Sequence, residues 1–181
     1  MASVFGHVAV AYAMGNTLKP AWASTRFWVL TVLCCLLPDA DVLGLMLGIP
    51  YEHILGHRGL THSIMFAVSI GLVMPPLAVP SLSRWSVRYG MLVLYFCLVT
   101  LSHGFLDAFT NGGLGVAFFS PFDTTRYFFP WRPIKVSPLG IGNFFTGSFS
   151  DDLSLCIVVF PFFVSFFVIN LVNSKDDFNS L

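Results

Sequence analysis

The chain has 181 residues, of which 56% are hydrophobic and 10% are charged, and its mean hydropathy is +0.80. Because about a quarter of the residues of a soluble domain are charged, this composition indicates an integral membrane protein. The formal net charge of zero argues against electrostatic capture of nucleic acid.

The first apolar run, residues 2–18, is a candidate membrane span. About 20 helical residues, each rising about 1.5 Å, cross the hydrocarbon core of about 30 Å. The run has no basic n-region and no polar cleavage site, so we expect a retained helix rather than a signal peptide. A second run begins near residue 21, and we expect it to be interrupted at the stretch "LPDADV".

Three further apolar runs follow along the chain, at residues 60–79, 88–109 and 153–172. Pro75 and Pro76 mark an end or a kink in the first of these, since a proline inside a helix removes a backbone hydrogen bond. The last run carries no charged residue. Together the runs predict an all-α, polytopic membrane helix bundle with about five transmembrane helices, in which residues 1–181 form a single membrane domain.

Residues 110–152, which we call the cap segment, separate the fourth and fifth runs. The segment contains "FFSPFDTTRYFFPWRPIKVSPLGIGNFF", which is rich in glycine, proline and aromatic residues. It is too irregular to span a membrane and too apolar to be a free linker. Aromatic rings favour the membrane interface, so we expect the cap segment to lie across one membrane face.

Seven ionisable residues fall near the same membrane face if the five runs alternate in direction. His7 lies about 8 Å along the first run, and His103 lies about 22 Å along the fourth, which is about 8 Å from its far end. Buried Asp and His residues in membrane proteins are rare and usually mark a functional site. The seven residues are His7, Asp39, Asp41, His57, His62, His103 and Asp107.

Two local patterns favour convergence of these side chains. The motif "SHGFLDA" places His103 and Asp107 four residues apart, so both project from one helix face. In "PDAD", Asp39 and Asp41 would point apart on a regular helix. Pro38 disfavours helical geometry there, so local unwinding would let both carboxylates converge.

The motif "HRGLTHS" spaces His57 and His62 by five residues, with Gly59 between them. This spacing is awkward on a regular helix and natural for a turn that leads into one. Thr61 or Ser63 is then the expected cap of the following helix.

The mixture of imidazoles and carboxylates fits a divalent transition metal with open positions for water, such as zinc, manganese or iron. Six or seven ligands are more than one ion needs and are suitable for two, so the sequence is compatible with either one or two ions. A proton relay or ion path uses the same residue types without a fixed metal. His7 by itself is as readily a packing residue as a ligand.

Arg58 has two interpretations. An arginine beside an apolar run commonly extends to the lipid headgroups. Beside a metal, it can instead bind a phosphate through two hydrogen bonds. Arg126 and Arg132 in the cap segment are weaker candidates for the second role, and interfacial anchoring is the simpler explanation for both.

Four motifs, "FGHVAVAYAMG", "LLPDADV", "HRGLTHS" and "SHGFLDAFTNGG", resemble the YdjM-like family of LexA-regulated, membrane-bound, predicted metal-dependent hydrolases. The stretch "PFDTTRYFFPWRPIKVSPLG" is similar to the aromatic loop of that family, and the resemblance extends to about residue 150. It implies an inner-membrane protein and a metal-dependent hydrolase in which the seven residues above are the matching polar positions. A more distant similarity, by analogy only, is to helical zinc phospholipases C and nucleases.

We therefore expect a metal-dependent hydrolase that cleaves a phosphoester in a lipid or lipid-linked substrate, with zinc as the first choice of metal. In this hypothesis Asp39 or Asp41 bridges the ions or accepts a proton, and Arg58 stabilises phosphoryl charge. A membrane protease or amidase could use the same residues. The main alternative is a transporter or ion-binding protein without chemistry. The apolar opposite halves of the runs favour a site open to one face only.

The distribution of basic residues predicts the orientation in a bacterial inner membrane. Three of the four site-side basic residues lie in the long cap segment, away from helix ends, where the positive-inside rule gives them little weight. We expect an outside N-terminus, a cytoplasmic C-terminus and a site that faces the extracytoplasmic side. The basic residues opposite the site are Lys19, Arg26, Arg84, Arg88 and Lys175, and those on the site side are Arg58, Arg126, Arg132 and Lys135. The oligomeric state stays open.

Overall fold

The computed structural model describes residues 4–18 and 23–136. These residues form helices and turns, with two isolated β-bridges and no strand. The predicted all-α class is confirmed for this part of the chain. The fifth apolar run, 153–172, and the second half of the cap segment lie outside the described residues.

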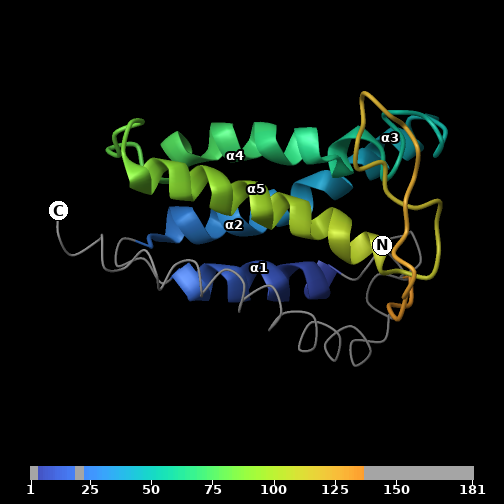
Figure 1. The fold of residues 1–181 in the computed structure, drawn as a ribbon, viewed down its shortest axis with the longest axis horizontal. Helices are drawn as coiled ribbons and strands as arrows, with labels where there is room; N and C mark the ends of the chain where they lie inside the picture. The colour runs from blue at the N-terminus through green and yellow to red at the C-terminus, as the bar shows by residue number, and fades with distance from the viewer. Residues whose placement is uncertain (1–3, 19–22, 137–181) are drawn as a thin grey trace.

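Four long helices lie side by side in the bundle (Figure 1): α1 (Val4–Leu18), α2 (Thr25–Leu36), α4 (Ile64–Ala78) and α5 (Val87–Ala108). Helix α5 packs against the other three, most extensively against α4. A short helix, α3 (Val42–Met46), lies at the bundle end where α1 begins and α5 ends. The longest helix therefore occupies the centre of the bundle and reaches this end.

Serine hydroxyls cap the starts of three of these helices. Each hydroxyl accepts a hydrogen bond from a backbone N–H three residues later, which satisfies one donor that the first helical turn leaves unpaired. The capping serines are Ser24, Ser63 and Ser86, and their donors are Phe27, Phe66 and Tyr89. Of the two caps considered for the helix after "HRGLTHS", Ser63 is the one that forms.

The unwinding expected at "LPDADV" is present. Helix α2 ends at Leu36 and continues as a 3₁₀ helix, η1 (Leu37–Asp41), before α3 begins. Pro38 stands near the start of η1, where its missing N–H removes a hydrogen bond of the α pattern. Pro75 and Pro76 lie in the final turns of α4, which ends at Ala78.

The middle of the bundle is a packed apolar core. Phe27 of α2 stacks on Tyr95 of α5 with ring centroids 5.2 Å apart, and Phe96 and Val99 are fully buried beside them. The polar atoms within this core are paired, because the Tyr95 hydroxyl lies 2.9 Å from the Thr31 hydroxyl. This core holds α2 and α5 in register and so fixes where their ends meet.

Two helical stretches of the described chain, Thr25–Met46 and Val87–Ala108, are long and apolar enough to cross a membrane by length and composition. Helix α4 is apolar but shorter. Its outward side chains, such as Leu72 and Val73, are more than half exposed, as suits a surface that faces lipid. Five crossings remain a prediction.

Candidate metal centre

The seven ionisable residues predicted from the sequence lie together at the bundle end where α1 begins and α5 ends. Six of them are buried, and Asp39 is the partly exposed member, with 11% of its side-chain surface accessible. They come from α1, η1, the turn before α4, and α5. The depth argument from the sequence therefore agrees with the three-dimensional arrangement.

Four of these side chains direct donor atoms at one another within 4.8 Å: Asp39, His62, His103 and Asp107, here called the four-residue group. His103 Nε2 lies 3.2 Å from Asp39 Oδ1, and His62 Nε2 lies 3.5 Å from Asp107 Oδ2. The cross distances are 3.7 Å from His62 Nε2 to Asp39 Oδ1 and 4.0 Å from His103 Nε2 to Asp107 Oδ2. Donor atoms around a tetrahedral ion with bonds of about 2.0–2.2 Å lie about 3.3–3.6 Å apart, which is close to this spacing.

His7 lies beside the four-residue group. Its ring stacks on that of His103 with centroids 3.7 Å apart, and its Nε2 lies 3.8 Å from Asp107 Oδ1. The thiol of Cys35 is near both histidines, but it donates a hydrogen bond to the backbone oxygen of His7. His7 therefore lies next to the four-residue group without joining it, and Cys35 is engaged with the backbone.

Hydrogen bonds on the far side of the rings orient His103 and His62. His103 Nδ1 lies 2.7 Å from the backbone oxygen of Cys35, which can only accept, so Nδ1 carries the proton and Nε2 presents a lone pair. His62 Nδ1 lies 3.2 Å from Asp41 Oδ2, which favours the same tautomer. Histidine ligands of metals are typically held in this way by a carbonyl or carboxylate.

Asp41 lies behind His62 and is surrounded by donors. Its Oδ1 is 2.7 Å from His57 Nδ1. Its Oδ2 accepts from the Arg58 backbone N–H at 3.1 Å and from the Thr61 hydroxyl at 2.6 Å. The structure thus places Asp41 and His57 next to the four-residue group, with Asp41 directed at the loop rather than at the group.

Arg58 is fully buried and does not extend to the headgroups. Its Nε lies 3.0 Å from Asp107 Oδ2, and Nη1 donates to the Gly112 oxygen at 2.9 Å. The backbone of Arg58 has φ 62°, a left-handed conformation that residues with a side chain rarely adopt. Such strain is often found at functional sites.

Gly113 lies against the site, and the sequence analysis did not single it out. A Cβ atom there would lie 2.8 Å from the Tyr51 hydroxyl oxygen and 2.9 Å from Arg58 Nη1, and its φ is +84°. The doubled glycine in "TNGG" was the available signal, because paired glycines often permit a close backbone approach. The close approach here is to the buried guanidinium.

The described part of the cap segment, residues 110–136, lies at the same bundle end (Figure 1). Arg126 Nη1 donates to the His57 backbone oxygen at 2.9 Å, and Nη2 donates to the Tyr51 backbone oxygen at 2.8 Å. Burial raises the pKa of the Tyr51 hydroxyl. Arg132 lies over the Phe128 ring. Arg126 therefore holds the loop in place, and within the described residues its hydrogen bonds go to the loop and not to the four-residue group.

The donor set fits a transition metal. Within the described chain, the Nε2 atoms of His7, His62 and His103 and both carboxylate oxygens of Asp39 are buried and make no hydrogen bond. Buried polar atoms without partners are uncommon and call for an explanation, such as an ion. Imidazole nitrogens with carboxylate oxygens suit zinc, manganese or iron.

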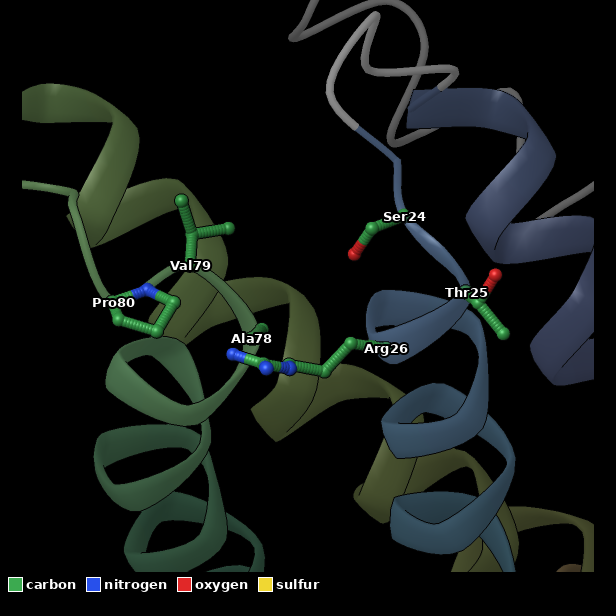
Figure 2. Close-up of a pocket in the computed structure, with 6 residues that line it drawn as sticks. All are labelled: Ser24, Thr25, Arg26, Ala78, Val79 and Pro80. Carbon is green, nitrogen blue, oxygen red and sulfur yellow. The ribbon is translucent and has the colours of Figure 1, made fainter.

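A separate pocket of about 450 Å³ lies where α2 begins and α4 ends (Figure 2). None of the predicted site residues lines it. Figure 2 shows the Arg26 side chain extending towards the end of α4, beside Ala78. The lining residues are Ser24, Thr25, Arg26, Ala78, Val79 and Pro80.

Comparisons with known proteins place these features in a family. The model of a family described as "YdjM inner membrane protein" matches residues 1–175. The chain is also 37% identical, over 148 residues, to the inner membrane protein YbcI of Escherichia coli (strain K12). The matched region covers 81% of this chain and 83% of that protein. No solved structure matches the chain.

Proposed function

This chain belongs to the YdjM inner membrane protein family, and from that premise we propose that it is a metal-dependent hydrolase acting on a phosphoester of a lipid or lipid-linked substrate. The observation that carries the proposal is the four-residue group. Two imidazoles and two carboxylates from three segments of the chain direct their donor atoms at one point, and the contacts behind both histidines fix the lone pairs in that direction.

Each side chain has a role in this proposal. The four-residue group holds the ion, which when bound lowers the pKa of a water molecule and polarises a phosphoryl oxygen. Asp39 is the accessible member, and its Oδ2, which makes no hydrogen bond within the described chain, accepts the proton of the attacking water. Arg58 Nη2, which is likewise buried without a hydrogen bond, binds a phosphoryl oxygen.

The surroundings of the site support a substrate that reaches it from the bilayer. The four-residue group lies at one end of an apolar bundle, and the helices beside it expose apolar side chains such as Leu33 and Leu72. A substrate that is already in the membrane needs no transfer from water to reach this depth. We propose that the protein crosses the membrane several times and that the site faces the extracytoplasmic side, as the basic residues indicate.

One observation favours a second candidate, an ion-binding or transport protein. Most members of the site are almost completely buried, which suits a bound ion better than a large substrate. A transporter also needs access from the other face. The described core below the site is filled by Tyr95, Phe96 and Val99, which supports a site open on one side.

The test uses the full chain, purified in detergent and loaded with zinc. It measures release of phosphate or headgroup from phospholipid and isoprenyl phosphate substrates. We expect turnover that chelation abolishes and zinc restores, with no turnover by Asp107→Ala. Arg132→Ala, which changes an arginine outside the four-residue group, is the matched control and should retain activity. A metal-loaded protein that is as inactive as its chelated form would favour the ion-binding candidate.

A further inference from the structure

We propose that the site holds one divalent ion, and that the guanidinium of Arg58 takes the place of a second cation. The inference rests on the metal centre of the proposed function and goes beyond it, because the ligand types alone leave one or two ions open. It depends on three observations: the contacts of Asp41, the position of His57, and the charge around Arg58.

Asp41 Oδ2, the carboxylate oxygen that faces His62, has no free acceptor position for a metal. An ionised carboxylate offers about two lone-pair positions on each oxygen. The His62 ring, the Arg58 backbone N–H and the Thr61 hydroxyl all lie within hydrogen-bonding distance of Oδ2, while the His57 ring lies at Oδ1. The oxygen nearest to the four-residue group is therefore occupied, and Asp41 acts as a positioning residue for His62.

A second ion held jointly by His57, His62 and Asp41 has no suitable ligand set. His57, His62 and Asp41 form a close group. Asp41 already contacts the Nδ1 atoms of both histidines, at 2.7 Å for His57 and 3.2 Å for His62. An ion at that point would have to bind His62 through Nδ1 while the first ion binds Nε2. That requires a doubly deprotonated imidazole, because a neutral ring keeps one N–H.

Arg58 supplies positive charge directly beside the four-residue group. Its Nε lies 3.0 Å from Asp107 Oδ2, the oxygen that also faces His62. The arginine is fixed on both sides of its backbone, since its N–H donates to Asp41 and its oxygen accepts from Ala117. A side chain held so completely is part of the site rather than a mobile neighbour.

The charge balance supports a single ion. The site contains three carboxylates and one guanidinium, which leaves two negative charges when the histidines are neutral, as ligands must be. One divalent ion compensates these charges. A second would leave two positive charges in a buried site, and buried charge without a partner is strongly unfavourable.

The experiment measures metal content and X-ray absorption of the full chain purified in detergent, loaded with zinc and freed of excess ion. We expect one zinc per chain and no metal neighbour at about 3.5–4 Å, the separation found in two-metal sites. Two zinc ions per chain, or a metal neighbour at that distance, would overturn the inference. No bound zinc would overturn both the inference and the proposed function.

Variants separate the roles of the two residues. We expect Arg58→Met, which removes a positive charge beside the ion, to bind its one zinc more tightly than the unmodified chain, while Arg58→Lys and the control Arg132→Met bind it with unchanged affinity. An Arg58→Met protein with unchanged zinc affinity would refute the role of Arg58. Asp41→Asn should retain one zinc with affinity about 10–100-fold weaker, as expected for a residue that orients a ligand. If Asp41 bridges two ions instead, this variant binds one zinc fewer than the unmodified chain. One bound zinc without hydrolysis would leave the inference intact and refute the hydrolase.

Discussion

Both halves of helix α5 contain buried side chains, but the polar atoms of the two halves differ in their partners. In the first half, Tyr95 and Phe96 are fully buried, and the Tyr95 hydroxyl is paired with the Thr31 hydroxyl of α2. In the second half, His103 and Asp107 are also fully buried, yet His103 Nε2 makes no hydrogen bond within the described chain. The first half therefore resembles an ordinary core, whereas the second half leaves a buried donor atom unpaired, as the proposed metal site requires.

The largest effect should come from removing a donor in the second half. His62→Ala should reduce hydrolysis to the level of the chelated protein, because one of the two oriented imidazole ligands is lost. Arg58→Ala should cost less, about 10²–10³-fold, as for loss of one group that stabilises charge in a transition state. Rates of phosphate release by the two variants decide the order. Equal activity of His62→Ala and the unmodified chain would remove His62 from the site.

A change in the first half should affect stability and leave the metal in place. Phe96→Ala removes a ring that packs against Phe27 and Tyr95, and substitutions of this kind in a core cost about 3–5 kcal/mol. The melting temperature in detergent should fall, while the zinc content of the folded protein stays unchanged. Loss of zinc from folded Phe96→Ala would mean that the two halves of α5 are not independent.

Gly113 tests the connection between the cap segment and the site. Gly113→Ala introduces a Cβ at 2.9 Å from Arg58 Nη1 and forces alanine into a left-handed conformation that costs about 1–2 kcal/mol. We expect a modest loss of stability together with reduced hydrolysis, since Arg58 must move. Gly90→Ala is the control, because a Cβ at Gly90 meets no atom within 4 Å. If Gly113→Ala and Gly90→Ala have the same stability and the same rate of hydrolysis, the close approach of Gly113 to Arg58 does not contribute to function.

The smallest effect should come from the closed polar contact in the core. Tyr95→Phe removes one hydroxyl, while the Thr31 hydroxyl keeps its bond to the Phe27 backbone oxygen. The free energy of unfolding should fall by about 0.5–1.5 kcal/mol, and the hydrolytic rate should not change. Thermal unfolding and the phosphate-release assay check both parts. A large loss of activity would show that the core contact is coupled to the site.

The parts of the site that depend on local sequence could be predicted. The spacing of His103 and Asp107 placed them on one helix face, and Pro38 indicated the unwinding that became η1. The Ser63 cap followed from its place before an apolar run. The family predicted from four motifs is also confirmed.

The division of labour among the polar residues could not be predicted in the same way. Asp39 and Asp41 look equivalent in the sequence, and they differ because donors from the turn before α4 surround only Asp41. The burial of Arg58 depends on Gly112 and Asp107, which are about fifty residues away. Spacing carries no information about such contacts, since they form only when α5 and the loop meet.

The hydrogen bond from His103 to the main-chain oxygen of Cys35 has a consequence for how the sequence can change over generations. The partner that fixes the tautomer of His103 belongs to the backbone of α2, so no mutation of a side chain can delete that acceptor. Position 35 is then constrained by the small buried space it fills, and a residue of similar volume, such as alanine or serine, should be tolerated there. Sequence drift in α2 can therefore proceed beside the ligand without disturbing its protonation.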